Sequence, residues 1–186
     1  MKNKTSLTKD AILKDPYNYT LKEMKDCLGE EMATDFFESL YKNKPKIQNQ
    51  TVKIKEVFNG KDTLKYAFEL SDGYCIETVC IKRKTGITVC VSTMVGCPVG
   101  CIFCASGKNG FIRNLSSSEI VQQIVLLKEK VNRIVFMGMG EPLLNYGEVI
   151  KAIHILRDRD GLNFPTDGIT ISTVGPINQL KKLREE

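Results

Sequence analysis

Three cysteines stand close together in one short stretch of the chain. Cys97, Cys101 and Cys104 are spaced C-x3-C-x2-C and directly follow an apolar run. A structural zinc site uses four protein ligands, and the only histidine, His154, lies far from these thiols in the sequence. A 4Fe-4S cluster held by three cysteines leaves one iron open for a substrate or cofactor. The spacing therefore favours an open iron–sulfur cluster over a closed zinc site, and over three buried free thiols that happen to share a loop.

Two later segments carry ligand-binding residue types where predicted strands end. The run Gly-Met-Gly-Glu-Pro at 138–142 follows an apolar strand predicted at 133–137, and Ser172 ends another predicted at 169–172. Glycines let backbone carbonyls approach a ligand closely, and such carbonyls accept hydrogen bonds from an ammonium group. Glu141 adds an acceptor for an ammonium or a ribose, and Ser172 suits a ribose hydroxyl or a carboxylate. Ordinary turn chemistry is the alternative explanation of this sequence.

The elements that must position these residues follow from the hydrophobic periodicity. A two-residue period between Thr51 and Ile81, interrupted by Asn-Gly and Asp-Gly turns, predicts a small antiparallel meander. Apolar strands at 88–91, 133–137 and 169–172 alternate with amphipathic helices, which predicts three βα units with right-handed crossovers. Active sites of such folds lie at the carboxyl ends of the strands, and the three candidate segments follow those ends.

Two short helices are predicted ahead of the meander. Thr20 and Glu23 have capping-box spacing at the start of the first helix, and Gly29 ends it. A second amphipathic helix is expected to end near Lys42. Residues 1–19 show little periodicity, which predicts a loose lead-in.

Composition narrows the class of protein. The 186 residues are 42% hydrophobic and 26% charged, as in an ordinary soluble globular protein, and no apolar run reaches transmembrane length. The N-terminal stretch lacks the apolar core of a secretory signal. Seven cysteines, three of them in one loop, suit a reducing compartment better than a disulfide framework. We therefore expect a cytoplasmic protein that does not contact a membrane.

Charge is distributed unevenly within a net charge of +5. Residues 78–118 include no Asp or Glu, and they carry five cations: Lys82, Arg83, Lys84, Lys108 and Arg113. This window surrounds the cysteine loop in the sequence, so it predicts that a polyanion such as nucleic acid reaches the reaction site. A solvated basic face without a ligand is the alternative.

Taken together, these motifs resemble a known family. The three-cysteine loop, with Phe103 before its last cysteine and Gly-Met-Gly-Glu-Pro one strand later, resembles radical S-adenosylmethionine enzymes. The runs at 76–79, 90–97, 110–115 and 136–142 resemble the RlmN/Cfr family more narrowly. Members of that family methylate an adenine of ribosomal RNA at C2 or C8, and the RlmN branch also acts on transfer RNA. The resemblance begins near Tyr17 and is strongest from Glu77 to Ser172.

The resemblance implies two cofactors and the residues that hold them. A 4Fe-4S cluster would be held by Cys97, Cys101 and Cys104. Its open iron would bind the amino and carboxylate groups of S-adenosylmethionine, and electron transfer would then give a 5′-deoxyadenosyl radical. Further contacts to S-adenosylmethionine would come from Gly140, Glu141 and Ser172. The implied partners are ribosomal or transfer RNA and an electron donor such as flavodoxin or ferredoxin, with the protein itself a monomer.

The resemblance also implies catalytic residues. Glu77 would be the proton acceptor, although a lone Glu on a strand is usually just solvent-facing. Cys90 would match the thiol that resolves the protein–RNA adduct. The family needs a further cysteine that first receives the methyl group, and none of Cys27, Cys75 and Cys80 has the matching sequence context. We therefore expect an incomplete, C-terminally truncated chain that does not methylate adenine by itself.

The expected fold class is α/β, a partial TIM-type radical SAM barrel with about three βα units behind a β-meander and an N-terminal helical module. The expected domains are a helical accessory module at 1–45, the meander and linker at 46–85, and the first half of the radical SAM core at 86–186. Two alternative functions remain at this point. One is a radical SAM enzyme acting on a substrate other than RNA, and the other is a non-catalytic RNA-binding fragment that holds a cluster or zinc.

Overall fold

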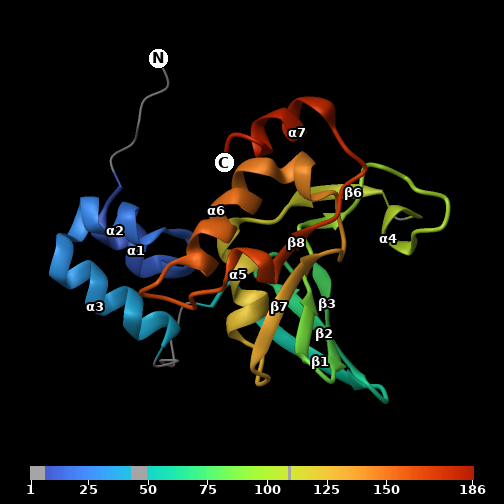
Figure 1. Cartoon of the computed structure of the whole chain (residues 1–186), viewed down its shortest axis with the longest axis horizontal. Coiled ribbons are helices and arrows are strands. Elements are labelled where there is room, and N and C mark those ends of the chain that lie inside the picture. The colour runs from blue at the N-terminus through green and yellow to red at the C-terminus, as the bar shows by residue number, and fades with distance from the viewer. Residues whose placement is uncertain (1–6, 43–49, 109) are drawn as a thin grey trace.

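A six-stranded mixed sheet forms the centre of the protein in a computed structural model that describes residues 7–42, 50–108 and 110–186 (Figure 1). Its strand order is β1-β2-β3-β4-β7-β8. The strands are β1 (Val52–Asn59), β2 (Thr63–Leu70), β3 (Cys75–Arg83), β4 (Gly86–Cys90), β7 (Val131–Phe136) and β8 (Ile169–Ile171). Strands β1 to β4 pair antiparallel, whereas β4, β7 and β8 pair parallel. The predicted α/β class is confirmed, and the meander continues without a break into the parallel strands.

Three helices accompany the parallel strands: α5 (Ser117–Val125), α6 (Tyr146–Arg157) and α7 (Ile177–Leu183). The predicted capping box at the start of α5 is present, because Ser116 accepts from the backbone N–H of Glu119 and the Glu119 carboxylate accepts from the N–H of Ser116. Short 3-10 turns, η2 (Pro142–Asn145) and η3 (Thr166–Gly168), precede α6 and β8. Among the described residues, no helix is long and apolar enough to span a bilayer.

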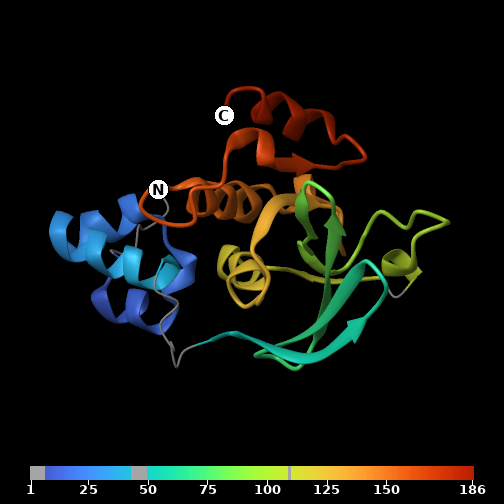
Figure 2. The same ribbon diagram turned by 60° about the horizontal axis from the view of Figure 1, so that its bottom comes forward.

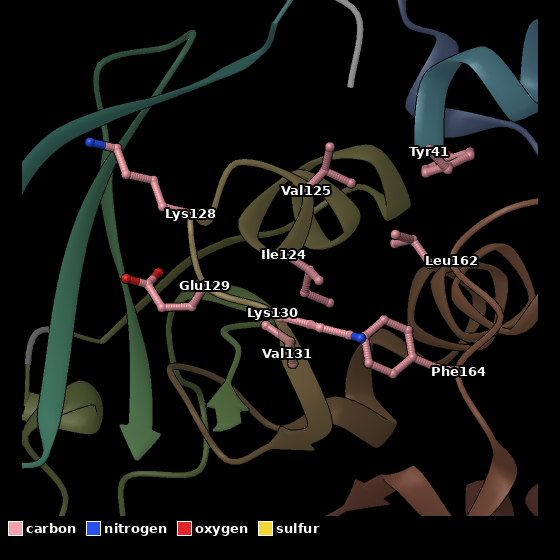
Figure 3. Close-up of a pocket in the computed structure, with 9 residues that line it drawn as sticks. All are labelled: Tyr41, Ile124, Val125, Lys128, Glu129, Lys130, Val131, Leu162 and Phe164. Carbon is pink, nitrogen blue, oxygen red and sulfur yellow. The ribbon is translucent and has the colours of Figure 1, made fainter. Parts of the chain in front are cut away.

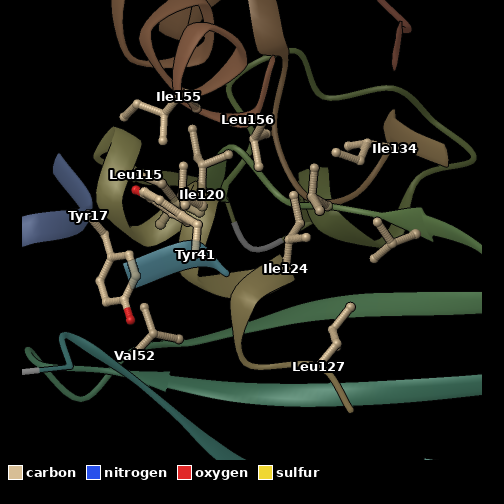
Figure 4. Close-up of a cluster of buried hydrophobic side chains, with 14 of the residues drawn as sticks. Tyr17, Tyr41, Val52, Leu115, Ile120, Ile124, Leu127, Ile134, Ile155 and Leu156 are labelled. Atoms are coloured by element: carbon tan, nitrogen blue, oxygen red, sulfur yellow. The ribbon is translucent and has the colours of Figure 1, made fainter. Parts of the chain in front are cut away.

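The main core lies between the sheet and helices α5 and α6. Ile120 and Ile124 of α5 and Ile155 and Leu156 of α6 are buried against β7, which contributes Ile134 (Figure 4). Burying a side chain of this size stabilises the fold by roughly 1.5–3 kcal/mol. Helices α5 and α6 therefore cover one face of the sheet and hold its strands in place.

The N-terminal helical module consists of α1 (Lys9–Lys14), η1 (Pro16–Asn18), α2 (Leu21–Leu28) and α3 (Glu30–Tyr41), and it lies beside the sheet at the end of the molecule away from α4 (Figures 1 and 2). The capping box of Thr20 and Glu23 is present, and Gly29 ends α2 with a φ of 86°. The predicted loose lead-in is wrong for residues 7–19. Thr8 caps α1 through Ala11, and Ile12 is completely buried, so one cap and a few apolar contacts order this segment.

Two serines of α5 anchor the helical module to the core. Ser117 Oγ donates to Asn18 at 2.6 Å, and Ser118 Oγ donates to Asp15 at 2.5 Å. Burial raises the pKa of Asp15, and the hydrogen bond from Ser118 opposes that shift. The expected boundary at 45/46 lies outside the described residues. The expected boundary at 85/86 falls in the turn between β3 and β4, which pair in one sheet.

A small hairpin that the sequence analysis did not predict carries the cysteine loop. It pairs β5 (Met94–Gly96) with β6 (Phe111–Asn114), and the short helix α4 (Ala105–Lys108) lies between the two strands. Gly96 has a φ of 74°, and a Cβ atom there would lie only 1.9 Å from the carbonyl oxygen of Gly110. Only glycine permits this close pairing, and the pairing fixes where the cysteine loop begins.

The face of the sheet opposite α5 is formed by alternate residues of each strand. Directly paired residues of neighbouring strands point to the same side, so the pairs Lys65↔Val79, Val79↔Cys90, Cys90↔Val135 and Val135↔Thr170 share one face. Their side chains are exposed or half-buried, whereas the residues between them are mostly buried. We call this surface the open face; it comprises Lys65, Glu77, Val79, Cys90, Val135 and Thr170.

Candidate functional site

The carboxyl ends of β4 and β7 are joined directly by hydrogen bonds. The carbonyl oxygen of Met139 accepts from the backbone N–H of Thr93 at 2.8 Å and of Met94 at 3.2 Å. Asn145, which is buried, donates from Nδ2 to the carbonyl oxygens of Thr93 and Leu115 at 2.9 and 2.8 Å. The hairpin that carries the cysteines is thereby held against the turn after β7. The prediction from the sequence that these segments meet is confirmed, but the role of Asn145 was not predicted.

Glu141 joins the turn after β7 to the segment after β8. Its side chain is 3% exposed. Oε1 accepts from Thr173 Oγ1 at 2.5 Å and from the N–H of Leu143 at 3.0 Å, and Oε2 accepts from the N–H of Val174 at 2.9 Å. From the sequence, Glu141 is predicted to accept hydrogen bonds from a ligand. In the structure its carboxylate is occupied by the protein itself, because a buried charge requires internal donors.

The glycines of the turn after β7 are required by close packing. A Cβ atom at Gly138 would lie 2.6 Å from the carbonyl oxygen of Val91, and one at Gly140 would lie 2.7 Å from the Cβ of Met94. Gly140 also has a φ of 105°. The sequence alone predicts that these glycines allow a ligand to approach. The structure adds a second reason, which is the contact between this turn and the β4–β5 segment.

Ser172 lies exposed at the end of β8, on the same side of the sheet as Thr170 two residues earlier. Its backbone N–H donates to the carbonyl oxygen of Phe136, so it lies beside the end of β7. Thr173 binds Glu141, which leaves Ser172 as the exposed hydroxyl of this segment. The predicted residues Gly140, Glu141 and Ser172 therefore belong to two segments that hydrogen bonds hold together.

Two backbone hydrogen bonds order the cysteine loop, one to the segment before β6 and one within the loop. The N–H of Cys97 donates to the carbonyl oxygen of Gly110 at 3.0 Å, and the N–H of Cys104 donates to that of Cys101 at 3.0 Å. Cys97 is buried, and Cys101 and Cys104 are half-buried. Within the described ranges, no group of three or more His, Cys, Asp or Glu side chains is gathered closely enough to hold a metal ion. To bind one metal cluster together, the sulfur atoms of Cys97, Cys101 and Cys104 must therefore lie closer to one another than they do in this structure.

The chemistry of the loop nevertheless fits an iron–sulfur cluster. Hydrogen bonds from the backbone N–H groups of Ser106 and then Gly107 lower the pKa of the Cys104 thiol. The thiolate is the form that binds a metal. Three thiols in one loop make a donor set with room for a fourth, non-protein ligand, as the open cluster needs.

Glu77 and Cys90 both lie on the open face. Glu77 is exposed and forms an ion pair with Lys65 at 2.9 Å. Its backbone carbonyl accepts from Ser92 Oγ at 2.6 Å, and the same Oγ accepts from the N–H of Met139 at 3.0 Å. Cys90 pairs with Val79, two residues after Glu77 on the same strand. Burial raises the pKa of the Cys90 thiol. Glu77 is thus tied through Ser92 to the turn after β7.

A completely buried glutamine of α5 supports this connection. Gln123 Oε1 accepts from Thr78 Oγ1 and from the N–H of Ser92, both at 2.8 Å. Its Nε2 donates to the carbonyl oxygens of Ser92 at 2.9 Å and Glu119 at 3.2 Å. Sequence reasoning missed Gln123 and Ser92. The only signal in the sequence is a polar residue within the apolar stripe of a helix.

The prediction that the cations of residues 78–118 surround the cysteine loop is wrong for most of these cations. Arg113 forms ion pairs with Asp72 at 2.6 Å and with the buried Glu119 at 2.8 Å, so its charge is already neutralised. Arg83 pairs with Gly86 at the beginning of β4, whereas the cysteine loop follows the carboxyl end of that strand. Lys82, Arg83 and Lys84 therefore lie at the opposite edge of the sheet, because β3 runs antiparallel to β4.

Comparison with known proteins identifies the superfamily to which a chain with this fold and site belongs. The family model for the radical SAM superfamily matches residues 91–186, and the chain belongs to that superfamily. A crystal structure of a radical SAM methyltransferase from Sphaerobacter thermophilus has a TM-score of 0.85 and 30% sequence identity, and the match covers 91% of this chain and 60% of that one.

Curated relatives narrow the similarity to RNA methyltransferases. A probable RNA methyltransferase from Rhodopseudomonas palustris (strain BisB5) is 61% identical over 127 residues, covering 68% of this chain and 35% of that protein. A probable dual-specificity RNA methyltransferase RlmN from Pseudothermotoga lettingae is 48% identical over 144 residues, covering 75% and 42%. The resemblance predicted from the motifs is confirmed. The chain spans about 35–42% of the length of these relatives.

Proposed function

We propose that this chain forms the cofactor-binding part of an RNA methyltransferase that acts at C2 of an adenine in large-subunit ribosomal RNA, with transfer RNA as a second candidate substrate. The observation that carries the proposal is the meeting of three segments at the carboxyl edge of β4, β7 and β8. Met139 and Glu141 hold the cysteine hairpin, the glycine turn and the segment after β8 together. Preorganised loops at this edge are where parallel α/β folds bind their ligands.

The proposed cluster ligands are Cys97, Cys101 and Cys104. The bound 4Fe-4S cluster would supply the electron for reductive cleavage of S-adenosylmethionine at its open iron. The chain's own contribution is to anchor the loop at Cys97 through Gly110 and to favour the thiolate at Cys104. Ile102 and Phe103, which lie between Cys101 and Cys104 in the sequence, are almost fully exposed.

Binding of S-adenosylmethionine is proposed for the backbone of Gly140 and the hydroxyl of Ser172. Glu141 acts beside them by holding both segments in place, since Thr173 and Val174 donate to its carboxylate. This role differs from direct ligand binding, and it predicts that loss of Glu141 disturbs both segments at once.

The proposed base and thiol are Glu77 and Cys90, which share the open face close to this edge. A general base must come within hydrogen-bond reach of the proton it takes, and an exposed carboxylate on an accessible face meets that requirement. The register of β3 places Glu77 on this face, where its carboxylate pairs with Lys65. Cys90 is half-buried, and burial raises the pKa of its thiol.

The remaining parts of the proposal concern organisation and partners. We assign residues 1–45 to an accessory module, 46–85 to the meander and 86–186 to the radical SAM core, in a monomeric cytoplasmic protein. A flavodoxin or ferredoxin would deliver the electron. The serine contacts from α5 to Asp15 and Asn18 support a fixed position of the accessory module on the core.

Formation of 5′-deoxyadenosine tests the proposal. The chain would be reconstituted anaerobically with iron and sulfide, mixed with S-adenosylmethionine and dithionite, and assayed by mass spectrometry. Cys97→Ala should abolish the product together with the bound iron, whereas the matched variant Cys27→Ala, in the helical module, should retain both. Equal product from the wild type and Cys97→Ala would overturn the proposal.

A further inference from the structure

Exposed cations gather at the edge of the sheet where β4 and β7 begin, opposite the cysteine loop. The β1–β2 turn reaches this edge, because the N–H of Lys82 donates to the carbonyl oxygen of Asp62 at 2.8 Å. Arg83 pairs with Gly86 at the start of β4, and Ile87 pairs with Val131 at the start of β7. Segments distant in sequence therefore meet along one edge. We call this surface the basic edge; it comprises Lys61, Lys82, Arg83, Lys84, Lys128 and Lys130.

The cations of the basic edge lack carboxylate partners. All six are exposed, and none forms an ion pair with a residue in the described ranges. The carboxylates within these turns are Asp62 and Glu129, and Glu129 accepts a hydrogen bond from Tyr66 at 2.6 Å. Elsewhere, lysines such as Lys65 and Lys151 are paired with glutamates. With six cations and two carboxylates, the basic edge presents a net positive potential to an approaching anion.

The dimensions of the basic edge suit a nucleic-acid strand. Its cations are distributed across the ends of β2, β3, β4 and β7, which are neighbours in the sheet. Three strand spacings of about 4.8 Å place its ends roughly 14 Å apart. A row of this length contacts several successive phosphates rather than a single small anion.

An apolar pocket opens beside two of these lysines. It has a volume of about 280 Å³ and lies between α3, the end of α5, the start of β7 and the loop before β8. Tyr41, Leu162 and Phe164 line it, with Tyr41 3% and Phe164 9% exposed, and Lys128 and Lys130 line it as well (Figure 3). Among the described residues, the buried hydroxyl of Tyr41 has no hydrogen-bond partner. Aromatic walls next to free cations are the combination by which proteins hold unstacked bases.

We infer that the basic edge and this pocket form a second RNA-binding surface, remote from the cysteine loop, which holds the phosphates of a single-stranded or looped segment and takes one unstacked base into the pocket. This inference rests on the proposed function, because it takes RNA as the substrate class. An acidic protein would also be attracted by the cations. The aromatic pocket favours RNA, since every base presents a flat face to stack and an acidic protein surface does not.

Charge reversal tests the phosphate contacts. The variant K82E/R83E/K84E should bind a looped RNA oligonucleotide about tenfold to a hundredfold more weakly than the wild-type chain, and the slope of log K against log salt should fall by roughly 2 for three lost contacts. The matched control K9E/K14E/K22E changes the net charge equally, at exposed lysines of the helical module. Its affinity should stay within a factor of about 3 of the wild type. Equal losses in both variants, or no loss in the first, would overturn the inference.

Pocket variants and an RNA oligonucleotide that lacks one base test whether the pocket binds a base. Phe164→Leu keeps an apolar side chain and removes the stacking surface, so affinity should fall about fivefold or more. An oligonucleotide with an abasic site at the inserted position should bind the wild type and the variant equally. Thermal unfolding of the variant shows whether it is folded, and Leu162→Ile serves as a second pocket variant without loss of an aromatic ring. A loss with Phe164→Leu that persists on every abasic oligonucleotide would overturn the base-binding role.

Failure of this inference is distinguishable from failure of the proposed function. Iron content and formation of 5′-deoxyadenosine do not depend on the basic edge, so K82E/R83E/K84E should retain both. RNA binding that is unaffected by this variant overturns the second surface and leaves the cofactor site in place. Tighter binding of an acidic protein such as flavodoxin to the basic edge, with unchanged RNA affinity, would also overturn it.

Discussion

Replacing Glu141 by Gln should destabilise the site more than its small change in shape suggests. Leu143 and Thr173 donate to one carboxylate oxygen, and the N–H of Val174 donates to the other at 2.9 Å. An amide keeps only one oxygen, so its NH2 group faces one of these donors. Hydrogen bonds to a charged group contribute about 1.5–3 kcal/mol each. Losing one of them and weakening two, with less charge to bury, should lower the free energy of unfolding by about 2 kcal/mol.

Thermal unfolding gives the measurement. For a chain of this length, about 2 kcal/mol corresponds to a fall in Tm of roughly 4–8 °C. Thr173→Val removes one donor and should cost about 1–2 kcal/mol, whereas the matched control Thr173→Ser keeps the hydroxyl and should cost less. Because both side chains share one bond, the double variant should lose less than the sum of the single losses. Additive losses, or a Glu141→Gln variant as stable as the wild type, would refute the reasoning.

Three further predictions concern the core and the thiols. Gln123→Ala removes a fully buried amide that is hydrogen-bonded to both the N–H and the carbonyl oxygen of Ser92. It should therefore lower the free energy of unfolding by about 2–4 kcal/mol. Urea unfolding measures this loss, and a change below about 0.5 kcal/mol would contradict the prediction. At pH 7, iodoacetamide should label the exposed Cys75 well before the buried Cys80. Burial raises the pKa of Cys80 to about 12 and should protect it until unfolding, as mass spectrometry of the labelled chain would show. The reconstituted 186-residue chain should leave adenine unmethylated in RNA digests, because none of Cys27, Cys75 and Cys80 has the sequence context of the family's methyl-carrying cysteine. Methyladenine in the digest would instead require one of these three thiols to carry the methyl group.

Local signals predicted much of the fold. The capping boxes at Thr20 and Ser116 fixed two helix starts, and the apolar runs identified the strands of the central sheet. The β5–β6 hairpin was missed because a strand of three residues, Met94–Gly96, is too short to show a period. The lead-in was missed because its order depends on tertiary burial of Ile12 rather than on local periodicity.

The sequence located the segments that form the candidate site, but it did not predict the contacts of each residue in them. Spacing identified the cysteine loop, and strand ends located the glycine turn. Whether Glu141 faces a ligand or the protein depends on Thr173, which follows it by 32 positions in the sequence. The basic window was misplaced for a similar reason: Lys82 and Cys97 are close in sequence, but the reversal from β3 to β4 separates their ends of the sheet. Adjacency along the chain predicts adjacency in space only when strand direction is known.

Electron paramagnetic resonance of the reconstituted, dithionite-reduced chain tests the central claim most directly. We predict about four irons per chain, a reduced-cluster spectrum that shifts when S-adenosylmethionine is added, and loss of both iron and signal in each of the variants Cys97→Ala, Cys101→Ala and Cys104→Ala. Stoichiometric zinc in place of iron, or a spectrum that survives the triple substitution, would contradict the assignment of these three thiols to an open cluster.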